Sequence, residues 1–265
     1  MMRNLIKRLF GRSGGWSRKL DVASVCSRGM VRSENQDSFL VADDRALFCV
    51  ADGMGGGDGG AEASAIMCRR LDRTVKARTS FPERIRQAAE AIRGANGEIR
   101  DYAHKAGYRQ MATTVVMLAL DEAPSATAIV ASVGDSRMYR FRDGNFQQMT
   151  HDHTLAGELS RRASMRSLAS EFGARTGALS HVLTRAVGIE EEVQPDWRKL
   201  DVHPGDVCMI CSDGVYDMVP DEGIRAAIAA GGTAAEIAAR IERLVLAEGA
   251  ADNFTAIVVK IGGGE

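Results

Sequence analysis

Short apolar runs rich in Val, Ile, Leu and Phe recur along the chain between polar stretches. Runs of this length and composition are typical of strands. The predicted strands cover residues 21–27, 37–42, 46–51, 112–120, 126–133, 137–142, 207–211 and 254–261. Tight links between successive strands, such as the Asp-Gly link at residues 142–145, imply antiparallel pairing.

Helical periodicity of the apolar positions is clearest at residues 60–77, 82–106 and 233–248, and it is weaker at 221–229. These helices do not alternate regularly with the strands. The order of elements therefore predicts an α+β fold with helices packed outside sheets, rather than a strictly alternating βα fold.

Four aspartates lie at the ends of apolar runs: Asp52, Asp135, Asp213 and Asp252. Carboxylates that are far apart in sequence but attached to buried strands can converge on one point. Such a cluster repels itself unless a cation holds it together. Mg²⁺ and Mn²⁺ take oxygen ligands of this kind. The pattern predicts a metal-dependent enzyme that acts on phosphate.

Composition limits the remaining function classes. The chain has 265 residues, 45% of them hydrophobic, which is enough for one large domain with a sizeable core. Its formal net charge is −1, so no overall field favours binding to nucleic acid. We find neither an apolar stretch of about 18 residues nor the pattern of a signal peptide. We therefore expect a soluble, cytoplasmic protein.

The five cysteines are odd in number and lie mostly in apolar runs, which favours reduced, buried thiols over a disulfide scaffold. Cys208 and Cys211 form a CxxC pattern inside a predicted strand, where residues three apart point to opposite faces. A zinc site would also need a second ligand pair. We therefore interpret the pattern as structural.

The first nineteen residues are basic and contain no acid. The positive charges are Arg3, Lys7, Arg8, Arg12, Arg18 and Lys19. Apolar residues interleave with them, so residues 1–19 could touch a membrane surface or a partner. The alternative, a mobile tail, is favoured by the Gly- and Ser-rich residues 11–15. We expect the folded domain to cover residues 20–265.

The Gly-rich run at residues 52–62 follows a predicted strand and opens a predicted helix. Three of its residues match the GxGxxG pattern of dinucleotide-binding proteins: Gly55, Gly57 and Gly60. Asp52 and Asp58 would crowd a pyrophosphate, and no alternating βαβ series follows. A P-loop is excluded because no Gly-Lys is followed by Ser or Thr. The better interpretation is that Asp52 binds metal while the carbonyl of Gly53 approaches a second ion.

An ordered set of motifs extends this interpretation along the domain. The motifs are Arg32–Ser38, Ala51–Gly56, Thr113–Thr114, Gly134–Arg137, Thr150–Thr154, Leu183–Gly188, Ser212–Asp217 and Asp252–Thr255. In this order they resemble the PPM family, the metal-dependent PP2C-type Ser/Thr protein phosphatases, and in particular its compact bacterial members. The resemblance covers about residues 21–262.

The resemblance implies a four-layer αββα sandwich of two antiparallel sheets flanked by helices, with a two-metal cleft at one edge. Asp52 would bridge two Mn²⁺ or Mg²⁺ ions, Asp213 and Asp252 would complete the first site, and the carbonyl of Gly53 would bind the second ion. Asp37 would orient metal-bound water. Asp135 with Asp213 would hold a possible third ion, and Arg32 would bind the substrate phosphate.

The implied reaction is hydrolysis of phosphoserine or phosphothreonine by a metal-activated water, without a covalent phosphoenzyme. Two positions depart from relatives. Met54 stands where eukaryotic relatives often have a His that could protonate the leaving alcohol, and a thioether cannot donate a proton. Gln36 replaces an acid found in some relatives.

Residues 154–181 contain several Arg and Ser and few apolar residues, and they fall where the family carries a flap beside the cleft. The arginines that could steer a phosphorylated protein are Arg161, Arg162, Arg166 and Arg175. The alternative is a short exposed helix with no role.

The histidines offer a second metal hypothesis. His151 and His153 are two apart, so a strand would place them on one face, where they could bind a transition metal. No third soft ligand is visible, which favours a loop role. We expect His104, His181 and His203 to be ordinary surface residues.

We therefore predict a monomeric Ser/Thr phosphatase whose partners are a phosphorylated protein substrate and a cognate Ser/Thr kinase. The alternative is a catalytically inactive phosphoprotein-binding module of the same fold. Such a module would normally lack one of the metal aspartates, and all the matched aspartates are present.

Overall fold

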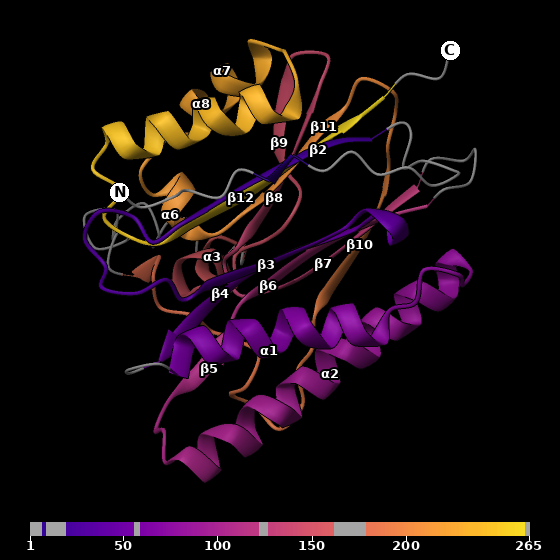
Figure 1. Ribbon diagram of the computed structural model, residues 1–265. Helices are drawn as coiled ribbons and strands as arrows, with labels where there is room; N and C mark the ends of the chain where they lie inside the picture. The colour runs from indigo at the N-terminus through magenta and orange to yellow at the C-terminus, as the bar shows by residue number, and fades with distance from the viewer. Residues whose placement is uncertain (1–6, 9–19, 56–58, 122–126, 162–178, 263–265) are drawn as a thin grey trace.

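The computed structural model describes residues 7–8, 20–55, 59–121, 127–161 and 179–262. In Figure 1, two antiparallel sheets lie face to face, with α1 and α2 outside one sheet and α7 and α8 outside the other. This arrangement is the four-layer αββα sandwich that the family resemblance implies.

One sheet has the strand order β1-β2-β12-β11-β8-β9, and the other has the order β10-β7-β6-β4-β3, with β5 beside β4. The strands of the first sheet are β1 Lys7–Arg8, β2 Leu20–Ser27, β12 Phe254–Ile261, β11 Val207–Cys211, β8 Arg137–Arg142 and β9 Asn145–Gln148. The strands of the second are β10 Asp196–Asp201, β7 Thr127–Val133, β6 Val115–Leu120, β4 Leu47–Gly55, β3 Asp37–Ala42 and β5 Met111–Thr113.

The helices form the two outer layers. They are α1 Gly59–Thr74, α2 Phe81–Ala106, α7 Asp221–Ala229 and α8 Ala234–Ala247, with the short helices α3 Leu155–Arg161 and α6 Asp213–Tyr216 and the 3₁₀ turn η2 Asp43–Arg45. The Ser80 side chain caps α2, and Thr233 forms a capping box with Glu236 at the start of α8. These caps fix the helix starts close to where the periodicity places them.

Three buried clusters hold the layers together. Leu47 and Ile92 belong to the cluster between the second sheet and α1 and α2. Phe48 and Ile210 belong to the cluster between the two sheets. The third cluster packs α7 and α8 on the first sheet. Successive residues of β4 thus alternate between two cores, as the twofold period of a strand requires.

The structure confirms the predicted helices and strands with small shifts, and it adds elements that the sequence pattern missed. The strands β9 and β10 were not predicted. Strand β4 continues past residue 51 to Gly55, so Asp52 lies inside a strand and not at its end. The predicted strand 112–120 is interrupted at Thr114.

Cys208 and Cys211 fall in different buried clusters on opposite faces of β11, which confirms the structural interpretation of the CxxC pattern. All five cysteines are free. No helix in the described ranges is long and apolar enough to cross a bilayer. Most of residues 1–19 lies outside the described residues; within it, β1 pairs with β2.

Candidate metal centre

The predicted site residues converge on one cleft of about 260 Å³. Its lining includes Arg32, Asp52, Gly53, Met54, Asp135, Asp213 and Asp252. Asp37 lies behind the cleft, where β3 pairs it with Asp52 of β4. Asp213 is the first residue of α6, directly after β11. Segments from both sheets therefore contribute carboxylates to one place.

Two glycines let these segments approach closely. A Cβ on Gly53 would lie 2.0 Å from the carbonyl oxygen of Gly60 in α1. A Cβ on Gly214 would lie 2.0 Å from the carbonyl oxygen of Asn253. Only glycine fits at either position, so the two Asp-Gly pairs place β4 against α1 and α6 against the loop before β12. This packing brings Asp52, Asp213 and Asp252 to the same cleft.

The carboxylates raise one another's pKa. Burial raises the pKa of Asp52 well above its usual value, and the charges of Asp37 and Asp213 raise it further. Burial and the charge of Asp213 raise the pKa of Asp135 to about 8. Burial also raises the pKa of Asp213. A site of this kind is stabilised by a proton or by a cation.

Asp37 is held through only one of its two oxygens. The hydroxyls of Ser212 and Thr255 donate to Oδ2 at 2.8 and 2.7 Å. Oδ1 is buried and has no hydrogen-bond partner among the described residues. Burial raises the pKa of Asp37 to about 7. A buried carboxylate oxygen left without a donor suits a role in receiving a hydrogen bond from water in the cleft.

Arg32 reaches the cleft from the loop before β3. Its Nη2 donates to Asp252 Oδ2 at 2.6 Å, and its side chain is 56% exposed. The backbone N–H of Asn253 donates to Asp252 Oδ1 at 2.7 Å. The guanidinium is therefore beside the carboxylates and open to solvent, where it can contact an anion.

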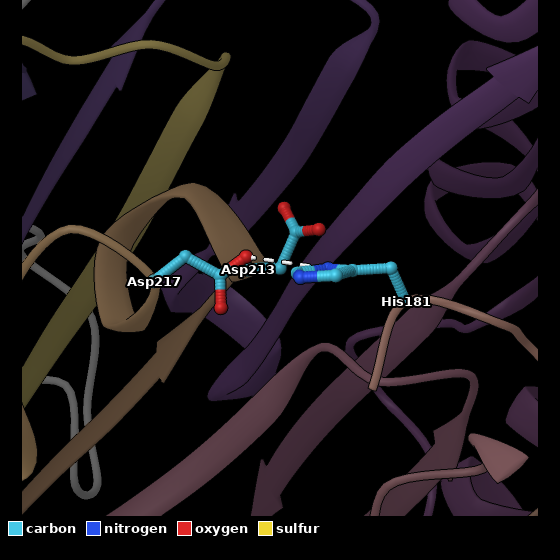
Figure 2. Close-up of side chains that lie close together, drawn as sticks. All are labelled: His181, Asp213 and Asp217. Carbon is cyan, nitrogen blue, oxygen red and sulfur yellow. Dashed lines mark ion pairs between the residues drawn. The ribbon is translucent and has the colours of Figure 1, made fainter. Parts of the chain in front are cut away.

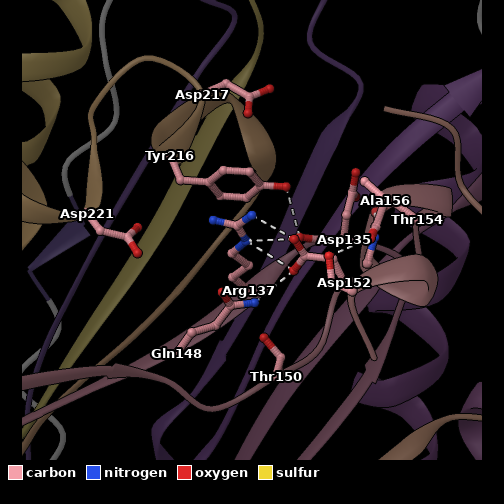
Figure 3. Close-up of polar contacts among 12 residues, drawn as sticks. Asp135, Arg137, Gln148, Thr150, Asp152, Thr154, Ala156, Tyr216, Asp217 and Asp221 are labelled. Carbon is pink, nitrogen blue, oxygen red and sulfur yellow. Dashed lines mark hydrogen bonds and ion pairs between the residues drawn. The ribbon is translucent and has the colours of Figure 1, made fainter. Parts of the chain in front are cut away.

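The turn that carries Asp135 is clamped by an aromatic and a cationic side chain (Figure 3). The Tyr216 hydroxyl donates to the backbone oxygen of Asp135 at 3.0 Å. The guanidinium carbon of Arg137 lies 3.5 Å from the centroid of the Tyr216 ring. Arg137 also donates to both oxygens of Asp152, with Nη2 2.6 Å from Oδ2. These contacts fix the direction of the Asp135 carbonyl.

His153 holds the other side of the same turn. Its side chain is fully buried, and Nδ1 accepts the backbone N–H of Gly134 at 3.1 Å. Because Nδ1 accepts, the proton of the neutral ring is on Nε2, which lies 3.2 Å from Asp196 Oδ2. Asp196 in turn accepts from Arg185 at 2.8 Å. His151 is exposed whereas His153 is buried, and residues 151–153 lie in a loop, as predicted.

His181 is exposed, as predicted, but it also lines the cleft, which sequence reasoning missed. Figure 2 shows its ring beside Asp213 and Asp217. The three residues offer ligand atoms within 4.8 Å of one another, and Nδ1 lies 3.6 Å from Asp217 Oδ2. No local pattern around His181 signals this position, because it depends on the tertiary contact with Asp217.

Of the four flap arginines, only Arg161 is among the described residues, and it lies 3.8 Å from Asp196. Arg162, Arg166 and Arg175 lie outside the described part of the chain, as do Gly57 and Asp58. Gln36 contributes its backbone oxygen to the N–H of Gly53 at 3.1 Å and also lines the cleft.

Known proteins share both the sequence and the fold. The family described as Protein phosphatase 2C matches residues 28–247. The serine/threonine phosphatase stp of Listeria monocytogenes is 30% identical over 240 residues, which cover 88% of this chain and 92% of that protein.

Two solved structures resemble the fold closely. PppA of Pseudomonas aeruginosa, described as a key regulatory component of T6SS, has a TM-score of 0.80 at 31% identity, covering 92% of this chain and 98% of PppA. The catalytic domain of the phosphatase PstP, in complex with two manganese ions, has a TM-score of 0.79 at 29% identity, covering 92% of this chain and 99% of that domain. The chain therefore belongs to the protein phosphatase 2C family and is a protein-serine/threonine phosphatase.

Proposed function

We propose that the cleft hydrolyses phosphoserine and phosphothreonine in proteins with two Mn²⁺ or Mg²⁺ ions, and so reverses a Ser/Thr kinase. The observation that carries this proposal is the convergence of Asp52, Asp213 and Asp252 on one cleft, where three neighbouring carboxylates need a compensating charge. Their donor set is all oxygen, which suits hard divalent ions.

The residues divide the work. Asp52 would contact both ions, Asp213 and Asp252 would complete one site, and the carbonyl of Gly53 would complete the other. When bound, the ions supply an activated water and neutralise charge on the phosphoryl oxygens. Asp37 would orient that water through Oδ1, the oxygen that has no partner among the described residues.

Arg32 would bind the substrate phosphate. Its guanidinium already contacts Asp252 and remains largely exposed, so it can turn toward a phosphate without leaving a buried charge unpaired. Asp135 and Asp213 are the candidates for a weaker third ion, and Asp217 and His181 lie close enough to Asp213 to contribute to it. Met54 lines the cleft but cannot protonate the leaving alcohol, which therefore takes its proton from water or from another residue.

The test measures phosphate release from a phosphothreonine peptide with Mn²⁺ added and then chelated. We expect release that requires the metal and falls roughly 100-fold or more in Asp213→Asn. The matched control is Asp201→Asn, which changes an exposed carboxylate on β10 and should retain activity. If no divalent ion supports release by the intact protein, the fold serves as a phosphoprotein-binding module instead.

A further inference from the structure

A second groove opens from the catalytic cleft and shares walls with it. Its volume is about 410 Å³. The two hollows have Met54, Gly55, His181 and Leu183 in common. A substrate segment whose phosphoryl group lies over the carboxylates therefore has a continuous path into this groove.

The floor and sides of this groove are mainly apolar. Met54, Leu183 and Ala186 line it, together with Val182 and Ile189. Val182 is 46% exposed and Ile189 is 49% exposed, so two branched aliphatic side chains face water beside the cleft. Exposed aliphatic side chains that line one groove are typical of a binding surface.

Hydrogen bonds hold the wall of the groove that residues 186–190 form. Val187 and Thr113 exchange two backbone hydrogen bonds at 2.8 and 2.9 Å. The buried side chain of Asn96 in α2 accepts the N–H of Gly188 at 2.7 Å and donates to the backbone oxygen of Glu190 at 3.0 Å. Because the wall is fixed before a ligand arrives, little ordering cost opposes binding there.

Charge at the outer end of the groove is negative. Glu190 lines it, and Glu191 and Glu192 follow as exposed residues. Within the described part of the chain, none of the three has a salt-bridge partner. Arg185 also lines the groove, but it already pairs with Asp196 at 2.8 Å and with Glu158 at 3.3 Å. Among the described residues, the groove therefore presents the Glu190 carboxylate to a ligand without a salt-bridge partner.

We infer that this groove binds the residues that flank the phosphorylated residue of the protein substrate, taking an apolar side chain next to the phosphoresidue and a Lys or Arg beyond it. The inference rests on the proposed function. The apolar side chain packs on Val182 and Ile189, and the basic side chain reaches the carboxylate of Glu190. Val182 and Ile189 are thus specificity-determining residues.

The test compares kcat/KM for two sets of phosphothreonine peptides. One set has Leu within two residues of the phosphothreonine, placed on either side in separate peptides, and the other has only Ser and Gly at these positions. We expect the best Leu peptide to be preferred roughly tenfold, because a partly buried Leu gains that much from apolar contact. In each of the single variants Ile189→Ser and Val182→Ser, the preference for the Leu peptide over the Ser and Gly peptide should fall below about twofold.

Two controls separate the groove from general effects. Leu244→Ser changes an aliphatic side chain on α8 that is 38% exposed and lies outside the groove, so it should keep the preference. Adding Lys beyond the Leu should raise kcat/KM further at low salt, and Glu190→Gln should remove this gain while Glu248→Gln keeps it.

Two outcomes would contradict the proposed groove, and a third would contradict the proposed function. If the intact protein has equal kcat/KM for Leu and Ser peptides, the groove does not bind the flanking residues of the substrate. The proposed phosphatase site would be unaffected by this result. A uniform rise for all peptides in Ile189→Ser also contradicts the proposed groove, because another segment of the chain would then fill the groove. Failure to release phosphate from any peptide contradicts the proposed function itself.

Discussion

At the scale of single residues, the turn that carries Asp135 is fixed by side chains from other segments. His153 accepts the N–H of Gly134, and Tyr216 donates to the carbonyl of Asp135. Neither side chain lines the cleft. They act by holding the backbone that presents the carboxylate, which makes them positioning residues.

This arrangement predicts different effects for two substitutions of His153. His153→Leu leaves the buried N–H of Gly134 without an acceptor and should cost about 1–3 kcal/mol of unfolding free energy. It should also raise the Mn²⁺ concentration needed for half-maximal phosphate release, because Asp135 loses its support. His153→Asn, whose amide oxygen can replace Nδ1 as the acceptor, should recover part of both losses.

Denaturant unfolding and a Mn²⁺ titration of activity measure these two quantities. If His153→Leu changed stability but left the Mn²⁺ dependence as in the intact protein, His153 would support the fold alone and the positioning role would be wrong.

The site residues were predictable from the sequence where they belong to a short motif. The site aspartates, Gly53 and Arg32 occur in short ordered motifs, and the structure brings them together. The sequence did not predict that His153 supports the Asp135 turn or that His181 lines the cleft, because a lone histidine has the same local pattern in a loop, in a core and in a cleft. What distinguishes them is the tertiary partner, Gly134 for one and Asp217 for the other.

At the scale of elements, the missed strands are edge strands. β9 and β10 each lie at the end of a sheet and carry mostly polar or charged residues. Edge strands are commonly protected by such residues, which removes the apolar run that predicts a strand. The central strands β11 and β12 contain the apolar runs Val207–Cys211 and Ala256–Val259, because both of their faces are covered. The bounds of both strands were predicted without error.

Two glycines, one at the contact between β4 and α1 and one on the exposed face of α2, predict opposite effects of substitution by alanine. In Gly53→Ala the new Cβ would meet the carbonyl of Gly60 at 2.0 Å, so β4 and α1 must separate. We expect a loss of at least about 1–3 kcal/mol of unfolding free energy and a severe loss of phosphatase activity. Gly97→Ala, in the middle of α2, meets nothing within 4 Å and should stabilise the protein by roughly 0.5–1 kcal/mol.

Thermal unfolding and phosphate release from the same preparations test this pair. A Gly53→Ala protein with the stability and activity of the intact chain would show that the close approach to Gly60 is unnecessary.

At the scale of the whole molecule, burying the carboxylates of the cleft lowers the stability of the fold. Segments from both sheets converge, and burial raises the pKa values of Asp37 and Asp135 to about 7 and 8. The four layers were predictable from the family resemblance. The amount of charge buried at the cleft was not, because it depends on how tightly the layers close around it.

Without divalent ions, this buried charge predicts a pH dependence of stability. A carboxyl whose folded-state pKa exceeds its unfolded value binds more protons when folded, so stability falls as pH rises from about 4 to 8. Chelated protein should therefore have a lower Tm at pH 8 than at pH 6. Mn²⁺ should raise Tm more at pH 8, because the ion replaces the protons.

Scanning calorimetry at several pH values, with chelator or with Mn²⁺, provides the measurement. Asp135→Asn removes one of the raised groups and should flatten the dependence for the chelated protein. A Tm that rises between pH 6 and pH 8 without metal would contradict the expectation.

The placement of the thiols has a consequence for oxidative stress. Burial raises the pKa values of Cys49, Cys208 and Cys211, with that of Cys208 raised to about 12, so these groups are protonated and poorly nucleophilic at neutral pH. The proposed reaction also uses oxygen ligands and no sulfur nucleophile. Peroxide or iodoacetamide, at doses that abolish a cysteine-dependent phosphatase, should leave phosphate release here within about twofold of the untreated rate. A cell could therefore remove phosphate from serine and threonine through an oxidative burst that silences phosphatases with a reactive thiolate.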